Sequence, residues 1–399
     1  MKIQHYRLFG GMLLVSGSCI GAGMLALPIV TGLAGFFPSM ALLALACAFM
    51  TFTSLLLLEM NSWFSKRVNL LSMMEIALGK KAKTLCFCFY LFLFYSLLVA
   101  YISASGQILS TWLDRSLGLP IPESFVSASF VFFFGIIVFL GTGIADVCNR
   151  FLMAGLGVCF FAMVGIGLPQ VELSYLQHMD VSYLVLSLPV LVLSFGFQNM
   201  IPSLSDYLDE DWLRVRKTIL GGSALVFFVY ALWQLLLMGL VPFAGSNGIY
   251  AIYSKGQEAS VALNFPFIGP FAKGFAFFAI VTSFLAQSLT LMHFLEDGLQ
   301  WSFTPLWRFC LTLITLVPPL VFAVSYPHIF YQAIGFAGGI CAVILFGIFP
   351  ILAVWSGRYK NKLSSSYQVW GGKASLCLAA FFAIFVLLQQ IYATWNAIS

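Results

Sequence analysis

The chain reads Ser-Gly-Ser-Cys-Ile-Gly-Ala-Gly-Met-Leu-Ala-Leu-Pro from residue 16 to residue 28, within its first long apolar segment. Gly17, Gly21 and Gly23 interrupt a stretch that would otherwise favour one continuous helix, and each glycine costs about 1 kcal/mol relative to alanine in a helix interior. A helix that breaks within lipid must hide its freed backbone groups in protein or in a water-filled cavity. The break is therefore a candidate binding site.

The composition places the chain in a membrane. Of its 399 residues, 61% are hydrophobic and only 8% are charged, whereas soluble domains carry about 25% charged residues. The nine cysteines lie in apolar runs or at their ends and lack metal-ligand spacing, so we expect reduced thiols packed as small hydrophobic side chains. No metal, no cofactor and no nucleic-acid partner is expected; membrane lipid surrounds the chain.

Eleven apolar runs are long enough to cross a bilayer, which needs about 20 residues each. They lie at about 8–34, 37–62, 84–113, 124–142, 149–168, 183–205, 216–242, 268–295, 307–325, 329–354 and 374–396. The loops at about 63–83 and 243–267 are long enough for a short amphipathic helix each. The prediction is an all-α membrane protein with a single transmembrane domain over residues 1–399.

The distribution of lysine and arginine predicts the orientation. With the N-terminus in the cytoplasm, 16 of the 19 basic residues fall in cytoplasmic segments and 3 fall outside, as the positive-inside rule requires. The C-terminus then lies outside the cell.

A second interruption begins the second half of the chain. Residues 194–202 read Ser-Phe-Gly-Phe-Gln-Asn-Met-Ile-Pro, and Pro202 suits the first turn of a restarted helix. Paired interruptions at corresponding places in two halves indicate a transporter binding site. The interrupted spans are the first and the sixth, so we predict a 5+5 inverted repeat over about 8–168 and 183–354, with an extra helix at about 374–396.

The predicted midplane contains almost no formal charge, so backbone groups would bind the ligand. A broken helix presents unpaired N–H groups and about half a positive charge at its new N-terminus, which suits a carboxylate. We expect this role for the N–H groups of Gly21, Ala22, Gly23 and Met24. Carbonyl groups near Ser18, Cys19, Phe195 and Gly196 would face an ammonium group. The expected ligand is a small zwitterion.

Side chains beside the breaks are expected to select the ligand. Phe195 and Phe197 could stack on an aromatic ring, Gln198 and Asn199 could bind a phenol or an indole, and Tyr101 in the third span could act as a gate or contact the carboxylate.

Glycine also packs membrane helices closely, and residues 17–21 form a small-xxx-small pattern of that kind. Close packing is therefore the alternative interpretation of the first break. For Gly335, Gly338 and Gly339 in the tenth span, packing is the interpretation that we favour.

Both interrupted segments resemble the motifs of a known family. Residues 20–28 are similar to the first-span signature of the bacterial aromatic amino acid permeases, the tyrosine- and tryptophan-specific transporters, and residues 194–197 with 201–204 are similar to their sixth-span motif. The chain differs from members with a His-Gly pair where Gln198-Asn199 stands. The resemblance implies a leucine-transporter-like fold and proton-coupled import across the inner membrane.

The coupling ion leaves two alternatives open. Glu59 and His293 are the best-placed candidates for proton coupling, because intramembrane ionisable residues are functional candidates by default. Thr282 and Ser283 could instead join first-span carbonyls around a sodium ion. A channel and an intramembrane enzyme are further alternatives, but the four histidines show no metal spacing and one pair of breaks suggests a single occluded site. The prediction is therefore a proton symporter for tyrosine or tryptophan, not an enzyme.

Overall fold

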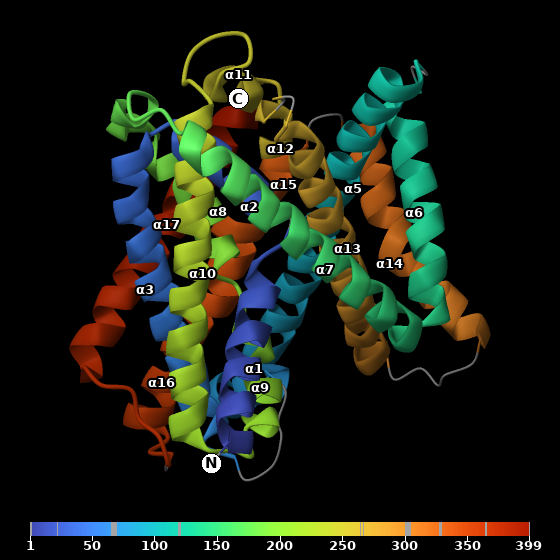
Figure 1. Cartoon of the computed structure of the whole chain (residues 1–399). Helices are drawn as coiled ribbons and strands as arrows, with labels where there is room; N and C mark the ends of the chain where they lie inside the picture. The colour runs from blue at the N-terminus through green and yellow to red at the C-terminus, as the bar shows by residue number, and fades with distance from the viewer. Residues whose placement is uncertain are drawn as a thin grey trace.

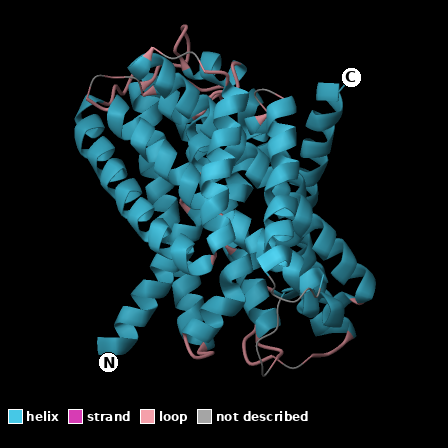
Figure 2. Cartoon of the chain, turned by 90° about the vertical axis from the view of Figure 1, so that its right-hand side faces the viewer, coloured by secondary structure: helices cyan, strands magenta, loops and turns pink. Residues whose placement is uncertain are grey.

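The computed structural model describes residues 2–21, 23–64, 70–118, 121–263, 265, 267–299, 305–326, 329–363 and 365–398. These residues form helices joined by loops, with no strand among them. The loops gather at the two ends of one bundle, and short non-helical stretches also lie inside it (Figure 2). The N-terminus lies at the lower end of Figure 1 and the C-terminus at the upper end, as an odd number of crossings requires.

The first half of the chain contains α1 (Lys2–Cys19), α2 (Gly23–Gly32), α3 (Phe36–Asn61), α4 (Leu70–Leu78), α5 (Lys80–Leu117), α6 (Glu123–Leu140) and α7 (Thr142–Gly167). The second half contains α8 (Leu184–Ser194), α9 (Ile201–Tyr207), α10 (Trp212–Leu240), α11 (Ile249–Ser254), α12 (Ala259–Ala262), α13 (Gly269–Leu299), α14 (Pro305–Ser325), α15 (Phe330–Phe336), the π-helix η5 (Ala337–Ile348), α16 (Phe349–Trp355), the π-helix η6 (Ser356–Lys360) and α17 (Gly372–Ile398). Short 3-10 turns connect α7 to α8 and α8 to α9.

The expected eleven spans are confirmed. Ten helical segments are long and apolar enough to cross a membrane, and the bent pair α1 and α2 makes an eleventh when it is counted as one span. The pair bends by 65° between Cys19 and Gly23, where the glycines stand in the sequence. Short helices also occupy both long loops, α4 in the first and α11 with α12 in the second.

The sixth span is also broken, as predicted. Helix α8 ends at Ser194, and α9 begins at Ile201 with Pro202 in its first turn. That position suits proline because the first N–H groups of a helix have no partner within the helix.

The tenth span differs from the regular helix that hydropathy alone indicates. It contains the π-helix η5, which packs against α5, α8 and α17. A Cβ atom on Gly338 would lie 2.0 Å from the carbonyl oxygen of Pro189, and one on Gly339 would lie 2.5 Å from the Gln390 side chain. The packing interpretation of these two glycines is confirmed, since any side chain would push η5 away from its neighbours.

The helices divide into neighbouring sets. Helices α1, α2, α3, α8 and α10 pack on one another, and α13 packs against α5 and α7. Helices α6 and α14 form one flank of the bundle, on the right in Figure 1, and α3 and α17 lie toward the opposite flank. This arrangement brings both broken spans against the same face of α10.

Candidate functional site

The two helix breaks lie against each other. A Cβ atom on Gly23, the first residue of α2, would lie 3.9 Å from the hydroxyl oxygen of Ser194, the last residue of α8. About two helix turns away from these two ends, the Ser187 hydroxyl of α8 donates to the carbonyl of Val30 of α2 at 3.2 Å. The start of α2 therefore faces the end of α8 across a distance that only small residues allow.

One tyrosine of α10 binds both breaks. The Tyr230 hydroxyl donates to the carbonyl of Cys19 at 2.6 Å and lies 2.9 Å from the carbonyl oxygen of Ser194. These carbonyls end α1 and α8, where each helix carries about half a negative charge. Tyr230 is fully buried, and its ring packs edge-on against Phe195, with the ring centroids 5.4 Å apart.

The next turn of α10 holds the restarted helix α2. The indole Nε1 of Trp233 donates to the carbonyl of Met24 at 2.9 Å, and the Thr31 hydroxyl donates to the side-chain oxygen of Gln234 at 3.1 Å. We call Tyr230, Trp233 and Gln234 the α10 clamp. The three side chains of the α10 clamp bind α1, α2 and α8. A movement of α10 would therefore displace the chain at both breaks together.

The first break also contacts α13 and α5. A Cβ atom on Gly21 would lie 2.4 Å from the hydroxyl oxygen of Ser283 in α13. The Ser283 side chain is hydrogen bonded to Tyr101 of α5. Gly21, Tyr101 and Ser283 thus lie next to one another, and Tyr101 is buried.

Backbone groups at the breaks are partly engaged within the chain. The Met24 N–H donates to the carbonyl of Gly21 at 3.0 Å. It is therefore not free to bind a substrate carboxylate, in contrast to the expectation from the sequence. The Phe197 N–H donates to the Phe195 carbonyl at 3.1 Å, so this carbonyl is engaged as well. The carbonyls of Cys19 and Ser194 are the ones brought together. Ala22 lies outside the described residues.

The side chains after the second break point in different directions. Phe195 and Phe197 are buried, whereas Asn199 is exposed. The amide Nε2 of Gln198 donates to the carbonyl of Met50 at 3.1 Å. This side chain therefore binds α3, whereas the sequence predicted that it lines the substrate pocket. The amide oxygen of Gln198 is buried and has no hydrogen-bond partner among the residues that the structure describes.

Comparisons with known proteins show the family of the chain. The model of the tryptophan/tyrosine permease family matches residues 4–390. The chain belongs to this family. It is 32% identical over 390 residues to "Tyrosine-specific transport system 1" of Haemophilus influenzae, covering 95% of each chain. It is also 32% identical over 411 residues to "Tryptophan-specific transport protein" of the same organism, covering 97% of this chain and 96% of the relative.

A solved structure supports the fold. The crystal structure of MhsT in complex with L-phenylalanine matches with a TM-score of 0.64 and 15% identity, over 96% of this chain and 97% of that one. The permease therefore has a leucine-transporter-like fold. Its relatives are named as transport proteins or permeases and not as enzymes.

Glu59, a candidate for proton coupling, is held in an ion pair with Arg358 in the structure. Its carboxylate is buried at the lower end of α3, where it accepts hydrogen bonds from Arg358 Nε at 2.6 Å, from a second Arg358 nitrogen and from the Val369 N–H at 2.8 Å. With three donors around it, the carboxylate joins α3 to the end of the tenth span at Arg358 and to Val369 in the segment after it.

The other coupling candidates lie on α13. His293 Nδ1 lies 3.4 Å from a carboxylate oxygen of Glu296 near the lower end, and the His293 side chain is 45% exposed. The Thr282 hydroxyl donates to carbonyls of its own helix, those of Phe278 and Ala279. Ser18 is exposed and donates to the carbonyl of Val15. Ser283 is thus the sodium candidate that faces the first break.

Sequence reasoning missed the α10 clamp. Tyr230, Trp233 and Gln234 are polar-tipped residues within about one turn of the seventh span, and the other side chains from residue 224 to residue 240 are apolar. Such groups seek hydrogen-bond partners when they are buried in lipid or protein. The spacing of these three residues indicates a cluster of hydrogen bonds, but it does not indicate which backbone carbonyls they bind.

Proposed function

We propose that this permease is a secondary active transporter that imports tyrosine or tryptophan across the bacterial inner membrane by proton symport with alternating access. The observation that carries the proposal is the meeting of two helix breaks at Tyr230. The named substrates of the relatives, tyrosine and tryptophan, support the aromatic class.

The breaks suit the zwitterionic part of an amino acid. The carbonyls of Cys19 and Ser194 end two helices and carry partial negative charge, which favours the substrate ammonium group. The start of α2 at Gly23 carries the opposite partial charge, which favours the carboxylate. In this arrangement the ammonium group replaces the Tyr230 hydroxyl on at least one carbonyl, and the Phe195 ring lies beside it.

The orientation follows from the charge distribution. We place the lower end of Figure 1, with the N-terminus, in the cytoplasm and the C-terminus outside. The break positions in α1–α2 and α8–α9 support two inverted repeats, over about 8–168 and 183–354, followed by α17. Alternating access would then move the α1, α2, α8 and α9 group relative to α5 and α13.

Two coupling ions remain candidates, each with its own observation. Of the two candidates for proton coupling, Glu59 is bound to Arg358 in a buried ion pair, whereas His293 is in no buried ion pair that the structure describes. His293 is therefore the candidate that we retain for a proton. For sodium, the hydroxyl of Ser283 lies against Gly21 at the first break. We favour the proton because the family resemblance implies it.

Reconstituted vesicles test the proposal. We expect labelled tyrosine or tryptophan to accumulate when the outside is acidified, and accumulation to stop when a protonophore is added. Unlabelled aromatic amino acids should compete, and alanine should not. Accumulation that needs a sodium gradient and ignores the protonophore would replace the proton with sodium. An absence of exchange between internal unlabelled and external labelled amino acid would overturn the carrier itself.

A further inference from the structure

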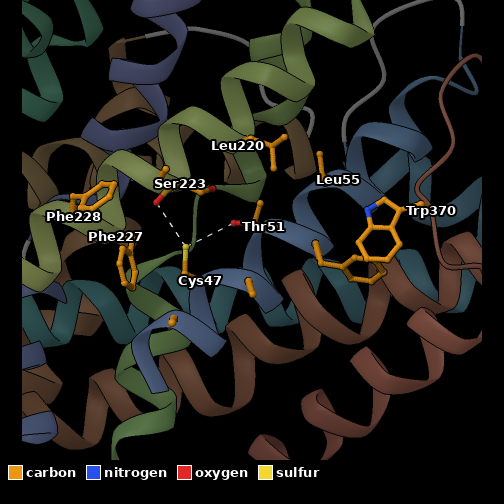
Figure 3. A pocket seen from close by; sticks show the side chains of 12 residues that line it. Cys47, Thr51, Leu55, Leu220, Ser223, Phe227, Phe228 and Trp370 are labelled. Carbon is orange, nitrogen blue, oxygen red and sulfur yellow. Dashed lines mark hydrogen bonds between the residues drawn. The ribbon is translucent and has the colours of Figure 1, made fainter. Parts of the chain in front are cut away.

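A groove on the outer surface of the bundle lies between α3 and α10. Its volume is about 510 Å³. Small residues leave it open: Ala44 and Ala48 lie one turn apart on α3, and Ala224 lines the groove from α10. Figure 3 shows Leu55, Leu220 and Trp370 at one end, and Phe227 and Phe228 at the other.

The groove is apolar but its floor is not uniformly so. Cys47 Sγ lies 3.7 Å from the carbonyl oxygen of Ser223 and 4.0 Å from the Thr51 hydroxyl (Figure 3). The Ser223 side chain lines the groove, is 2% exposed, and its hydroxyl has no hydrogen-bond partner in the described part of the chain. A buried hydroxyl without a partner costs free energy, which a ligand ester or hydroxyl oxygen in the groove would relieve.

The lower end of the groove has the charge of a headgroup site. Arg216 and Lys217 precede Leu220 by four and three residues, so they lie on the same face of α10 as the groove. Arg216 also interacts electrostatically with Tyr367, three residues before Trp370. Trp370 is 76% exposed, as is typical of aromatic residues at a membrane interface.

We propose that the α3–α10 groove binds one anionic phospholipid of the cytoplasmic leaflet. An acyl chain lies between the helices over Ala48 and Ala224, and the phosphate lies at Arg216 and Lys217. Groups of basic residues beside grooves between membrane helices bind anionic headgroups in this way. The choice of leaflet rests on the orientation proposed above, whereas the binding itself does not.

A lipid in this groove would touch both helices that hold the transport site. Helix α10 carries the α10 clamp, with Tyr230 two residues beyond Phe228. Helix α3 accepts the hydrogen bond from Gln198 at Met50, two residues after Ala48. Filling or emptying the groove changes the separation of α3 and α10, so the bound lipid would set the position of the α10 clamp.

Native mass spectrometry of the full chain with added phosphatidylglycerol or phosphatidylcholine tests the binding. The wild type should retain phosphatidylglycerol in preference to phosphatidylcholine. Arg216→Gln with Lys217→Gln should weaken phosphatidylglycerol binding about 30-fold, from the usual contribution of two basic residues near a membrane surface. Ala48→Trp and Ala224→Trp, which fill the groove, should remove the preference.

Matched controls make the result specific. Ala154→Trp places the same bulk on an exposed position of α7, and Lys81→Gln removes an exposed charge at the same end of the bundle. Both should retain phosphatidylglycerol as the wild type does. Equal binding by the groove variants and the wild type would overturn the proposal. A failure of amino acid uptake with lipid retention intact would instead count against the transport function.

Discussion

The hydroxyl of Tyr230 lies 2.6 Å from the carbonyl oxygen of Cys19, 211 residues away in the chain. Because α1 ends at Cys19 and α8 ends at Ser194, the same hydroxyl lies at the ends of two separate half-helices. A single side chain of α10 thus satisfies polar groups that a break in a membrane helix leaves exposed.

Removing this hydroxyl should impair transport without removing the ring. We expect Tyr230→Phe to leave the contact with Phe195 in place and to leave both carbonyls without their donor. A buried acceptor left unsatisfied costs about 1–3 kcal/mol, so we expect uptake to fall at least tenfold. The initial rate and the KM of uptake, measured in reconstituted vesicles, check this.

Tyr95→Phe is the matched control. The Tyr95 hydroxyl donates to the carbonyl of Ile314 at 2.8 Å, between α5 and α14 and away from the breaks. This variant should transport at close to the wild-type rate. If both variants lose activity equally, the effect of Tyr230→Phe is a general packing defect, and the carbonyls it binds are not part of the site.

The space at Gly21 gives a second prediction. An added Cβ atom would lie 2.4 Å from the Ser283 hydroxyl oxygen but 3.7 Å from the Ser283 Cβ. We expect Gly21→Ala to reduce uptake strongly, and Ser283→Ala to restore part of it in the double variant. A double-mutant cycle on the uptake rates measures this coupling.

Gly23 provides the contrasting position at the same break. Among the described residues, its added Cβ atom would meet the Ser194 hydroxyl alone, at 3.9 Å. Gly23→Ala should therefore retain uptake, and Gly23→Leu should abolish it while the protein still inserts, because the longer side chain fills the space between the two breaks. Full uptake by Gly23→Leu would remove the first break from the binding site.

The sequence predicted the parts of this fold that depend on local composition. Runs of apolar residues located the spans, and Gly21, Gly23, Gly196 and Pro202 located both breaks, because glycine and proline weaken a helix wherever they occur. The contacts between α2 and α8 then followed from the expected pairing of the first and sixth spans.

The parts that depend on tertiary contacts could not be predicted. Glu59 appeared to be a free intramembrane acid because its partner Arg358 lies 299 residues away. Gln198 was assigned to the pocket because it follows the break, yet its amide binds the carbonyl of Met50. In both cases a polar group binds whichever partner the packing brings near, and spacing along the chain carries no information about that partner.

The pair of Glu59 and Arg358 gives a third prediction. Their side chains are 0% and 7% exposed, so Arg358→Gln should leave a buried, uncompensated carboxylate and destabilise the protein by about 3–5 kcal/mol. Adding Glu59→Gln should recover part of this loss, because no charge is then buried. Thermal unfolding in detergent compares the variants.

The exposed pair of Arg150 and Asp146 serves as the control for the buried pair. Their side chains are 77% and 57% exposed, and exposed pairs contribute about 0–1 kcal/mol. Arg150→Gln should thus barely change the unfolding temperature. If Arg358→Gln is equally mild, the pair at the lower end of α3 does not hold the tenth span in place.

The loop helices at the upper end give the last prediction, which concerns pH. Glu258 is fully buried at the start of α12, where its carboxylate accepts a hydrogen bond from the Ser260 N–H, and burial raises its pKa from 4.5 to about 7. Tyr331 of α15 lies close to it, and no cation is among the groups that shift its pKa. The folded loop therefore holds the Glu258 proton more tightly than the unfolded chain does.

This difference fixes the sign of the pH dependence. Below pH 4.5 the Glu258 carboxyl group is protonated in both the folded and the unfolded state, and its burial then costs no ionisation free energy. Between pH 4.5 and about 7 the unfolded chain releases the proton while the folded chain keeps it. The free energy of unfolding therefore falls as pH rises over this range. The full loss is about 3 kcal/mol. We expect the unfolding temperature of the wild type to fall over this pH range relative to that of Glu258→Gln. The control variant Glu172→Gln removes an exposed acid at the same end of the bundle, and its unfolding temperature should follow that of the wild type. Parallel curves for the wild type and Glu258→Gln would show that the carboxyl group is hydrated, and that α12 does not bury it against α2 and α13.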